Sequence, residues 1–194
     1  MVQILELFGG IGSPRCALRN IGIPVKSIDY VEIDEAAVRS YNAMFAKDLS
    51  YKTQTVVGYN LRPDILIHGS PCQDMSVAGH QGTATGNGRT NHGAGAEEGS
   101  GTRSSLMWET INIIKQMGEW KPKYVIWENV KNVRSKYMVH NHDRYMEELS
   151  KLGYTSTYEL LDAREFGIPQ ARERYFTVSC LKGKKFDFSD LIRT

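Results

Sequence analysis

Apolar runs that end at a glycine or an acidic residue recur along this chain, and stretches with helical periodicity follow them. Residues 2–8 (VQILELF) form the first run and continue directly into a glycine turn at residues 9–12. Ser13 suits a helix N-cap, Pro14 suits a first helical position, and Gly22 favours the end of that helix. The pattern predicts a strand, a glycine turn and a helix, in that order.

A second unit of the same kind follows. Residues 25–33 alternate between apolar and polar positions as far as Glu32, and Asp34 can cap the next helix. The apolar face of that helix holds Ala37, Val38, Tyr41 and Phe45. An acid at a strand end, 22 residues after Gly10, is well placed to accept hydrogen bonds from a ribose, although Glu32 also fits a solvated acid before a helix.

The third strand leads to a cysteine. Residues 65–67 (ILI) lie between Asp64 and Gly69, and their length and β-branched content predict a strand buried on both faces of a parallel sheet. Pro71 and Cys72 come shortly after it. Ligands of α/β sheets bind at the carboxyl ends of the strands, so Cys72 lies where chemistry is expected. Taken alone, Cys72 also fits a small buried core residue.

The later elements are predicted by the same rules. They are a helix capped by Ser105 with Leu106, Ile113, Ile114 and Met117 on one face, a buried strand at 124–130, a helix at 143–152 ended by Gly153, and a strand at 155–161. Together these elements predict one α/β domain over residues 1–194, with a mostly parallel sheet flanked by helices, as in a Rossmann-like fold.

Two segments lack the periodic apolar pattern that predicts a helix or a strand. Within residues 47–61, Asp48 fits either a strand-end acid near an adenine or a solvated turn. Residues 76–102 hold eight of the 18 glycines of the chain. A loop of this length is usually a lid or a disordered linker, and its position directly after Cys72 favours a lid.

Composition narrows the function classes. Lys and Arg number 24 against 22 Asp and Glu, a net charge of +2, so any basic surface for nucleic acid must be local. The cysteines, Cys16, Cys72 and Cys180, are too far apart for a metal or disulfide framework and indicate a reducing compartment. His140 and His142 have no nearby cysteine or acid cluster, so we expect a surface turn there and no metal site. With no apolar run long enough for a membrane and no leader, a cytoplasmic protein is expected.

Functional groups gather at the predicted strand ends. The turn at Gly10 and Gly12, the acid Glu32, the Pro71–Cys72 pair and Glu128 would all open on one edge of the sheet. Arg15 stands where a dinucleotide-binding turn requires its third glycine, which disfavours NAD or FAD.

Two arginines lie in the extended run at residues 170–179. Arg172 and Arg174 point the same way by the two-residue period of a strand, which suits a phosphate or a polar base edge. The same pattern fits an edge strand whose arginines are solvated.

These motifs in this order resemble the cytosine-5 DNA methyltransferases. The matching segments are Phe8-Gly9-Gly10-Ile11-Gly12, Pro71-Cys72-Gln73, Glu128-Asn129-Val130 and Gln170-x-Arg172-x-Arg174, and the likeness extends from about Gln3 to Cys180.

The resemblance implies that the chain transfers a methyl group from S-adenosyl-L-methionine to C5 of a cytosine flipped out of double-stranded DNA. Cys72 would add to C6, Glu128 would bind the N3/N4 edge, and Arg172 or Arg174 would favour the thiolate and hold O2 or a phosphate. The resemblance also assigns the remaining roles. The cofactor pocket would comprise Phe8, Gly10, Ile11, Gly12, Glu32, Ile33, Asp48, Pro71 and Leu106. Gln73, Ser76, Asn129 and Gln170 would belong to the substrate side and the lid.

The match to the family also has gaps. No target-recognition domain and no late Gly-Asn-Ser motif is found up to Thr194, and Ser13 replaces a frequent third glycine. A truncated chain, a split enzyme completed by a second chain, or a decayed remnant would each explain this. We expect these residues alone to bind cofactor weakly and to lack sequence-specific methylation. The alternatives are a tRNA cytosine methyltransferase, a silent S-adenosylmethionine-binding module and, more distantly, a nicotinamide oxidoreductase.

Overall fold

A computed structural model of the chain describes residues 1–45, 51–56, 62–69, 106–136 and 138–194. Asp48, the segment from Pro71 to Ser76, the predicted lid and the predicted cap Ser105 lie outside the described residues.

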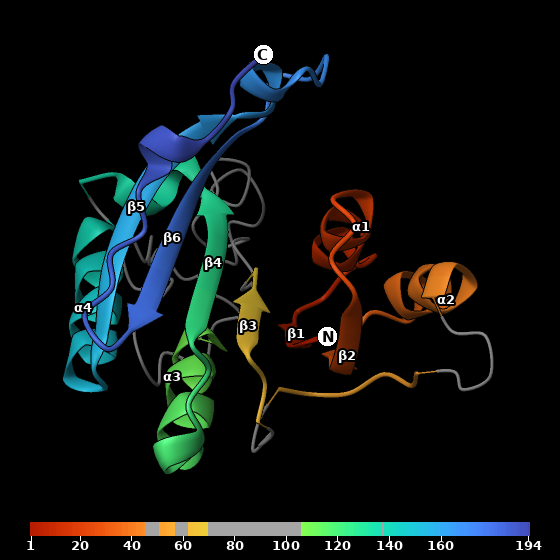
Figure 1. The fold of residues 1–194 in the computed structure, drawn as a ribbon, viewed down its shortest axis with the longest axis horizontal. Helices are drawn as coiled ribbons and strands as arrows, with labels where there is room; N and C mark the ends of the chain where they lie inside the picture. Colours follow the sequence, from red (N-terminus) through yellow and green to blue (C-terminus); the bar gives the residue numbers. More distant parts are fainter. Residues whose placement is uncertain (46–50, 57–61, 70–105, 137) are drawn as a thin grey trace, which may run out of the picture.

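One mixed sheet forms the centre of the described structure (Figure 1). Its six strands in the described residues are β1 (Val2–Leu7), β2 (Val25–Val31), β3 (Ile65–His68), β4 (Tyr124–Val130), β5 (Tyr154–Asp162) and β6 (Glu173–Leu181). They lie in the order β2-β1-β3-β4-β6-β5. The first four are parallel to one another, whereas β6 runs antiparallel to both β4 and β5. The predicted α/β fold with a mostly parallel sheet is confirmed.

Because β6 is antiparallel to β4, its first residues lie at the edge of the sheet where β4 ends. Because β1 to β4 are parallel, their carboxyl ends meet at one edge of the sheet. The antiparallel strand β6 begins at that same edge, where Arg174 pairs in register with Val130 at the end of β4. Residues 44 positions apart in sequence are thereby brought side by side.

Helices pack beside the sheet (Figure 1). Those of the described residues are α1 (Ser13–Asn20), α2 (Glu35–Phe45), α3 (Met107–Gln116) and α4 (Val139–Lys151). Asp34 caps α2 as predicted, because its side chain accepts a 2.8 Å hydrogen bond from the N–H of Ala36. Ser13 is not the cap of α1: Gly12 holds that position with φ +83°, and no side chain caps the helix. Leu106 occupies the N-cap of α3, again without a side-chain cap.

The start of α4 corrects a second prediction. The helix begins at Val139, four residues before the predicted start, and includes both His140 and His142. The predicted surface turn is therefore wrong. His142 shares a helix face with Tyr145 and Leu149, and all three are buried. A buried imidazole is tolerated here because a hydroxyl on β6 pairs with it.

Two of the packed clusters support the centre of the sheet and its β2 edge. The larger one joins β1, β3 and β4 to α3 and α4 through fully buried side chains that include Leu5, Leu66, Met107, Ile114, Trp127 and Tyr145. The smaller one, Tyr30, Val38 and Tyr41, lies between β2 and α2. Each such aliphatic or aromatic side chain contributes about 1.5–3 kcal/mol by leaving water, so the packed elements hold the strand ends in place.

Candidate active site at the carboxyl edge of the sheet

Glu128 lies at the carboxyl end of β4 and faces two guanidinium groups. The Nε of Arg174 is 3.0 Å from its Oε1, and an Nη of Arg172 is 3.6 Å from the same oxygen. The side chain of Arg174 is 24% exposed and that of Arg172 is 48% exposed. The structure thus brings together three of the residues singled out from the sequence, with Arg174 as the closer and less exposed partner.

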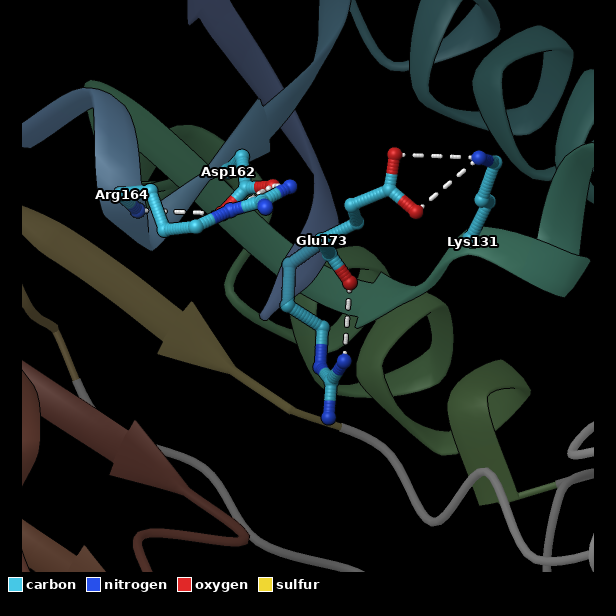
Figure 2. Close-up of polar contacts among 5 residues, drawn as sticks. Lys131, Asp162, Arg164 and Glu173 are labelled. Atoms are coloured by element: carbon cyan, nitrogen blue, oxygen red, sulfur yellow. Dashed lines mark hydrogen bonds and ion pairs between the residues drawn. The ribbon is translucent and has the colours of Figure 1, made fainter. Parts of the chain in front are cut away.

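Ion pairs hold the start of β6 in place (Figure 2). Both carboxylate oxygens of Glu173 are 3.0 Å from the Nζ of Lys131, which follows β4. Glu173 alternates with the two arginines along the strand, and its backbone carbonyl accepts a 2.8 Å hydrogen bond from Arg174. This pair therefore connects β4 and β6 beside the Glu128 cluster.

The turn between β5 and β6 is fixed by a second pair, also drawn in Figure 2. Asp162 accepts hydrogen bonds from the backbone and the guanidinium of Arg164, at 3.0 Å and at 3.0 and 2.5 Å. These hydrogen bonds hold the pKa of Asp162 below its ordinary value. The N–H of Ala163 also donates to the carbonyl of Arg172 at 3.1 Å, so the arginine segment begins from a closed turn.

The end of β3 passes beside the same carboxylate. A Cβ placed on Gly69 would lie 3.4 Å from Oε2 of Glu128. Gly69 is the last described residue before the Pro71-Cys72-Gln73 motif, which lies outside the described residues together with Ser76. The structure therefore shows where the segment leading to Cys72 leaves the sheet.

The glycine turn after β1 is tied to the end of β2. The N–H of Gly10 donates to Oε2 of Glu32 at 2.9 Å, and Oε1 of Glu32 accepts from the N–H groups of Ile33 and Asp34 at 2.8 and 3.0 Å. A carboxylate offers about four acceptor positions, so Glu32 keeps capacity for a further donor. Phe8, with φ +54°, turns the chain out of β1.

The apolar residues of the predicted cofactor pocket differ in exposure. Ile11 is 55% exposed and Ile33 is 73% exposed, and both belong to the predicted cofactor pocket. Leu106 lies at the start of α3, half-buried, while Phe8 packs against the large core cluster. A carboxylate with spare acceptor capacity and exposed apolar side chains beside it are groups that can bind the ribose and the base of a nucleoside.

Asn129 and Gln170 take different positions. Asn129 is buried, and its Oδ1 accepts from the N–H of Val130 at 2.7 Å, while its Nδ2 has no partner in the described part of the chain. Gln170 is exposed in the turn before β6, and its N–H donates to the carbonyl of Ile168.

A buried polar layer that the sequence patterns did not predict lies beneath this edge. Trp127 is stacked between His68 and His142, with ring centroids 5.7 and 5.4 Å away. His68 pairs with the hydroxyl of Tyr145 at 2.7 Å, and His142 pairs with that of Thr177 at 2.9 Å. Burial lowers the pKa of His68 to about 3 and that of His142 to about 4, so both are neutral at pH 7. The available signal was His68 at the end of an otherwise apolar strand.

A buried acid at Glu6 was also missed. It is 1% exposed on β1, and its Oε2 accepts a 2.5 Å hydrogen bond from the hydroxyl of Tyr41. Burial raises the pKa of Glu6, and the hydrogen bond from Tyr41 opposes that rise. A charged residue inside the apolar run of residues 2–8 was the signal in the sequence.

Two kinds of feature are absent from the described residues. None of their helices has the length and apolar character that crossing a membrane requires. In the same residues, no group of three or more His, Cys, Asp and Glu side chains is arranged to hold a metal ion.

Comparison with known proteins identifies similar sequences. A family model described as C-5 cytosine-specific DNA methylase matches residues 2–193. The type II methyltransferase M2.ScrFI of Lactococcus lactis subsp. cremoris is 32% identical over 236 aligned positions, covering 93% of this chain and 61% of that protein. The orphan methyltransferase M.Rho11sI of Bacillus phage rho11s is 33% identical over 187 residues, covering 91% of this chain and 32% of that protein. The chain thus spans roughly a third to three fifths of these relatives' own lengths.

Solved structures share the fold. The Dnmt2 methyltransferase of S. pombe superposes with a TM-score of 0.71 at 19% identity, over 98% of this chain and 52% of that one. The methyltransferase EhMeth of Entamoeba histolytica gives a TM-score of 0.69 at 21% identity, over 96% of this chain and 55% of that one. At such low identities the likeness establishes the fold and nothing finer.

Proposed function

The chain belongs to the family of C-5 cytosine-specific DNA methylases, and on that premise we propose that it transfers a methyl group from S-adenosylmethionine to C5 of a cytosine in double-stranded DNA. The observation that carries the proposal is the meeting of Glu128, Arg172 and Arg174 at the edge where β3 ends.

Chain connectivity supports the role of Cys72. Three residues of polypeptide span at most about 11 Å, and Cys72 follows Gly69 by three positions. Because Gly69 lies beside the Glu128 carboxylate, we propose that the Cys72 thiol acts together with the three charged groups. Cysteine, carboxylate and guanidinium groups in one place provide the parts of a nucleophilic site.

The proposed mechanism begins with the thiol. An ordinary cysteine is only a few per cent ionised at pH 7, and nearby guanidinium groups favour the thiolate. The Cys72 thiolate adds to C6 of cytosine, forming the S–C6 bond and leaving electron density on C5. Glu128 binds the N3/N4 edge of the ring and stabilises the form in which that edge is protonated. Arg174 holds Glu128 in place and, with Arg172, offers donors to the cytosine O2 or a phosphate.

When bound, S-adenosylmethionine would supply the methyl group to C5 and leave as S-adenosylhomocysteine. Loss of the C5 proton to a water molecule acting as base, with cleavage of the S–C6 bond, would then restore the aromatic base and release the Cys72 thiolate. The target carbon cannot be reached inside a duplex, so the base must flip out of the stack. Gln73, Ser76 and the glycine-rich segment after them are proposed to close over it, as lids commonly do.

The described residues fit the methyl donor. Glu32 orders the glycine turn by accepting from the N–H of Gly10, and it keeps an acceptor position for a ribose hydroxyl. Phe8, Ile11 and Ile33 provide apolar surface for the adenine or the methionine chain. We propose that Leu106, Asp48 and Pro71 complete this pocket.

A mechanism-based trap tests the function. The chain is incubated with S-adenosylmethionine and DNA duplexes of genomic sequence that contain 5-fluorocytosine. This base cannot lose its C5 fluorine after methyl transfer, so the covalent adduct persists. We expect a denaturation-resistant protein–DNA adduct with the wild type, none with Cys72→Ala, and a rate roughly 100-fold lower with Glu128→Gln. Cys16→Ala, which alters a partly exposed cysteine of α1, is the matched control and should react normally.

Other outcomes separate the alternatives. An adduct on fluorinated tRNA and none on duplex DNA would assign the chemistry to RNA. A chain that binds S-adenosylmethionine but forms no adduct on either nucleic acid would be a silent binding module. An adduct that persists in Cys72→Ala would refute the proposed nucleophile.

A further inference from the structure

Two stacked tyrosines support the glycine turn. Tyr30 at the end of β2 and Tyr41 of α2 are fully buried, and their ring centroids are 3.7 Å apart. A Cβ on Gly9 would lie 2.6 Å from the ring of Tyr30, and one on Gly12 would lie 2.6 Å from the ring of Tyr41. The turn therefore rests directly on the two rings, which is possible only because glycine stands at both positions.

The hydroxyl of Tyr30 binds the turn itself. It donates a 2.5 Å hydrogen bond to the carbonyl oxygen of Gly10, whose N–H donates to Glu32. Gly10 has φ +52°, a conformation that other residues rarely adopt. Tyr30 of β2 and Glu32, directly after β2, thus hold the backbone of Gly10 through its carbonyl and its N–H.

The hydroxyl of Tyr41 connects three other elements. It donates to the buried Glu6 of β1 at 2.5 Å and accepts from a guanidinium nitrogen of Arg15 in α1 at 3.0 Å. Oε1 of Glu6 has no hydrogen-bond partner in the described part of the chain. Burying a carboxyl group on an otherwise apolar strand costs stability. Apolar packing gives no reason to place a carboxyl group here. The hydrogen bond that Glu6 accepts from Tyr41 does, because it fixes the ring that lies beneath Gly12.

From these contacts we infer that Tyr30 and Tyr41 are positioning residues of the proposed cofactor site. Tyr30 holds the turn through the Gly10 carbonyl, and Tyr41 holds it through its ring, with Glu6 and Arg15 fixing the ring. Ordering a loose turn costs conformational entropy, and a turn already held in its bound shape avoids that cost on binding. This inference rests on the proposed function, because it assumes that the turn binds S-adenosylmethionine.

Binding of S-adenosylhomocysteine, the demethylated product, tests the inference without any need for catalysis. Isothermal titration calorimetry on the full chain should show a dissociation constant roughly 10-fold weaker for Tyr30→Phe, with a loss of similar size for Tyr41→Phe. Glu6→Gln keeps an acceptor for the Tyr41 hydroxyl and should retain affinity, whereas Glu6→Met should lose it.

Tyr154→Phe is the matched control. The Tyr154 hydroxyl is also buried and donates to a backbone carbonyl, that of Pro122, at 2.7 Å. Tyr30→Phe and Tyr154→Phe should lower the melting temperature by similar amounts, but only Tyr30→Phe should weaken binding.

The outcomes separate this inference from the proposed function. Wild-type binding that Tyr30→Phe and Tyr41→Phe leave unchanged would overturn the inference alone. A folded wild-type chain that does not bind S-adenosylhomocysteine would overturn both. If Tyr30→Phe fails to fold, Tyr41→Phe and the two Glu6 variants decide the matter.

Discussion

Arg172 and Arg174 both face the carboxylate of Glu128, but they differ in distance and in exposure. Arg174 reaches Oε1 of Glu128 at 3.0 Å from the half-buried start of β6, whereas Arg172 stands 3.6 Å away and is about twice as exposed. Water screens an exposed ion pair far more than a sheltered one. At the scale of single residues, Arg174 is therefore the partner that orients Glu128, and Arg172 keeps more freedom to meet a substrate.

This difference gives a prediction for the trapping reaction. Arg174→Lys should slow adduct formation by roughly 10- to 100-fold, because lysine cannot reproduce the planar guanidinium contact. Arg172→Lys should slow it by about threefold or less at saturating DNA. The initial rates of 5-fluorocytosine adduct formation measure both effects, and a larger loss at Arg172 would contradict the assignment.

Elements at the β2 end of the sheet depend on close packing against glycine. Gly12 precedes α1 with φ +83°, directly over the rings of Tyr41 and Phe45. Gly22 follows the same helix with φ +73°, but apart from its chain neighbours no atom of the described residues lies within 4 Å of the place where its Cβ would be. The two ends of α1 thus need glycine for different reasons: conformation alone at Gly22, conformation and space at Gly12.

Alanine at each position separates these two reasons. Gly22→Ala should lower the free energy of unfolding by about 1 kcal/mol, the cost of a left-handed conformation for a residue with a Cβ. Gly12→Ala should lose a further 1–3 kcal/mol or so, because its methyl group would overlap the aromatic rings. Urea denaturation of the two variants measures the difference, and equal losses would show that the rings move aside freely.

Across the whole molecule, the layer of His68, Trp127 and His142 joins the centre of the sheet to α4. Both imidazoles are neutral in the folded state at pH 7, because burial lowers the pKa of His68 to about 3 and that of His142 to about 4. In the unfolded chain both return to an ordinary pKa near 6.5. In the sequence, His68 directly precedes Gly69 and Trp127 directly precedes Glu128. A change that disturbs this layer should therefore also disturb the proposed site.

The layer should make the whole fold sensitive to acid. Above pH 6.5 neither state binds protons at these histidines, so they add no pH dependence. As pH falls below 6.5, only the unfolded state binds them, and stability decreases by about 1.4 kcal/mol per pH unit for each histidine. At pH 5 the loss is about 2 kcal/mol per histidine.

Urea midpoints between pH 7.5 and pH 5 measure this effect. His142→Gln, which keeps a polar group for Thr177, should roughly halve the pH dependence. His140→Gln, on the exposed side of the same helix, is the control and should keep the wild-type dependence. If His142→Gln leaves the dependence unchanged, that histidine does not contribute to the acid sensitivity.

Much of this architecture follows from local patterns. The period of apolar residues predicted the strand that became β4 with its bounds unchanged, and it predicted β1, β2 and β3 to within two residues. A strand or a helix depends on backbone geometry and on the burial of one face. Both leave a periodic pattern of apolar residues in a short stretch of sequence, so these elements can be predicted locally. Caps and helix starts were less well predicted at Ser13 and at α4, since these depend on what packs against them.

By itself, then, the sequence determined the strands, the glycine turn, the order of the motifs and the common direction of Arg172 and Arg174. Only the tertiary structure decided that both arginines meet Glu128, that a histidine of α4 lies in the core, and that the turn rests on Tyr30 and Tyr41. The reason is physical. These contacts join residues far apart in the chain, and they exist only because β6 runs antiparallel beside β4 and because β2 pairs with β1.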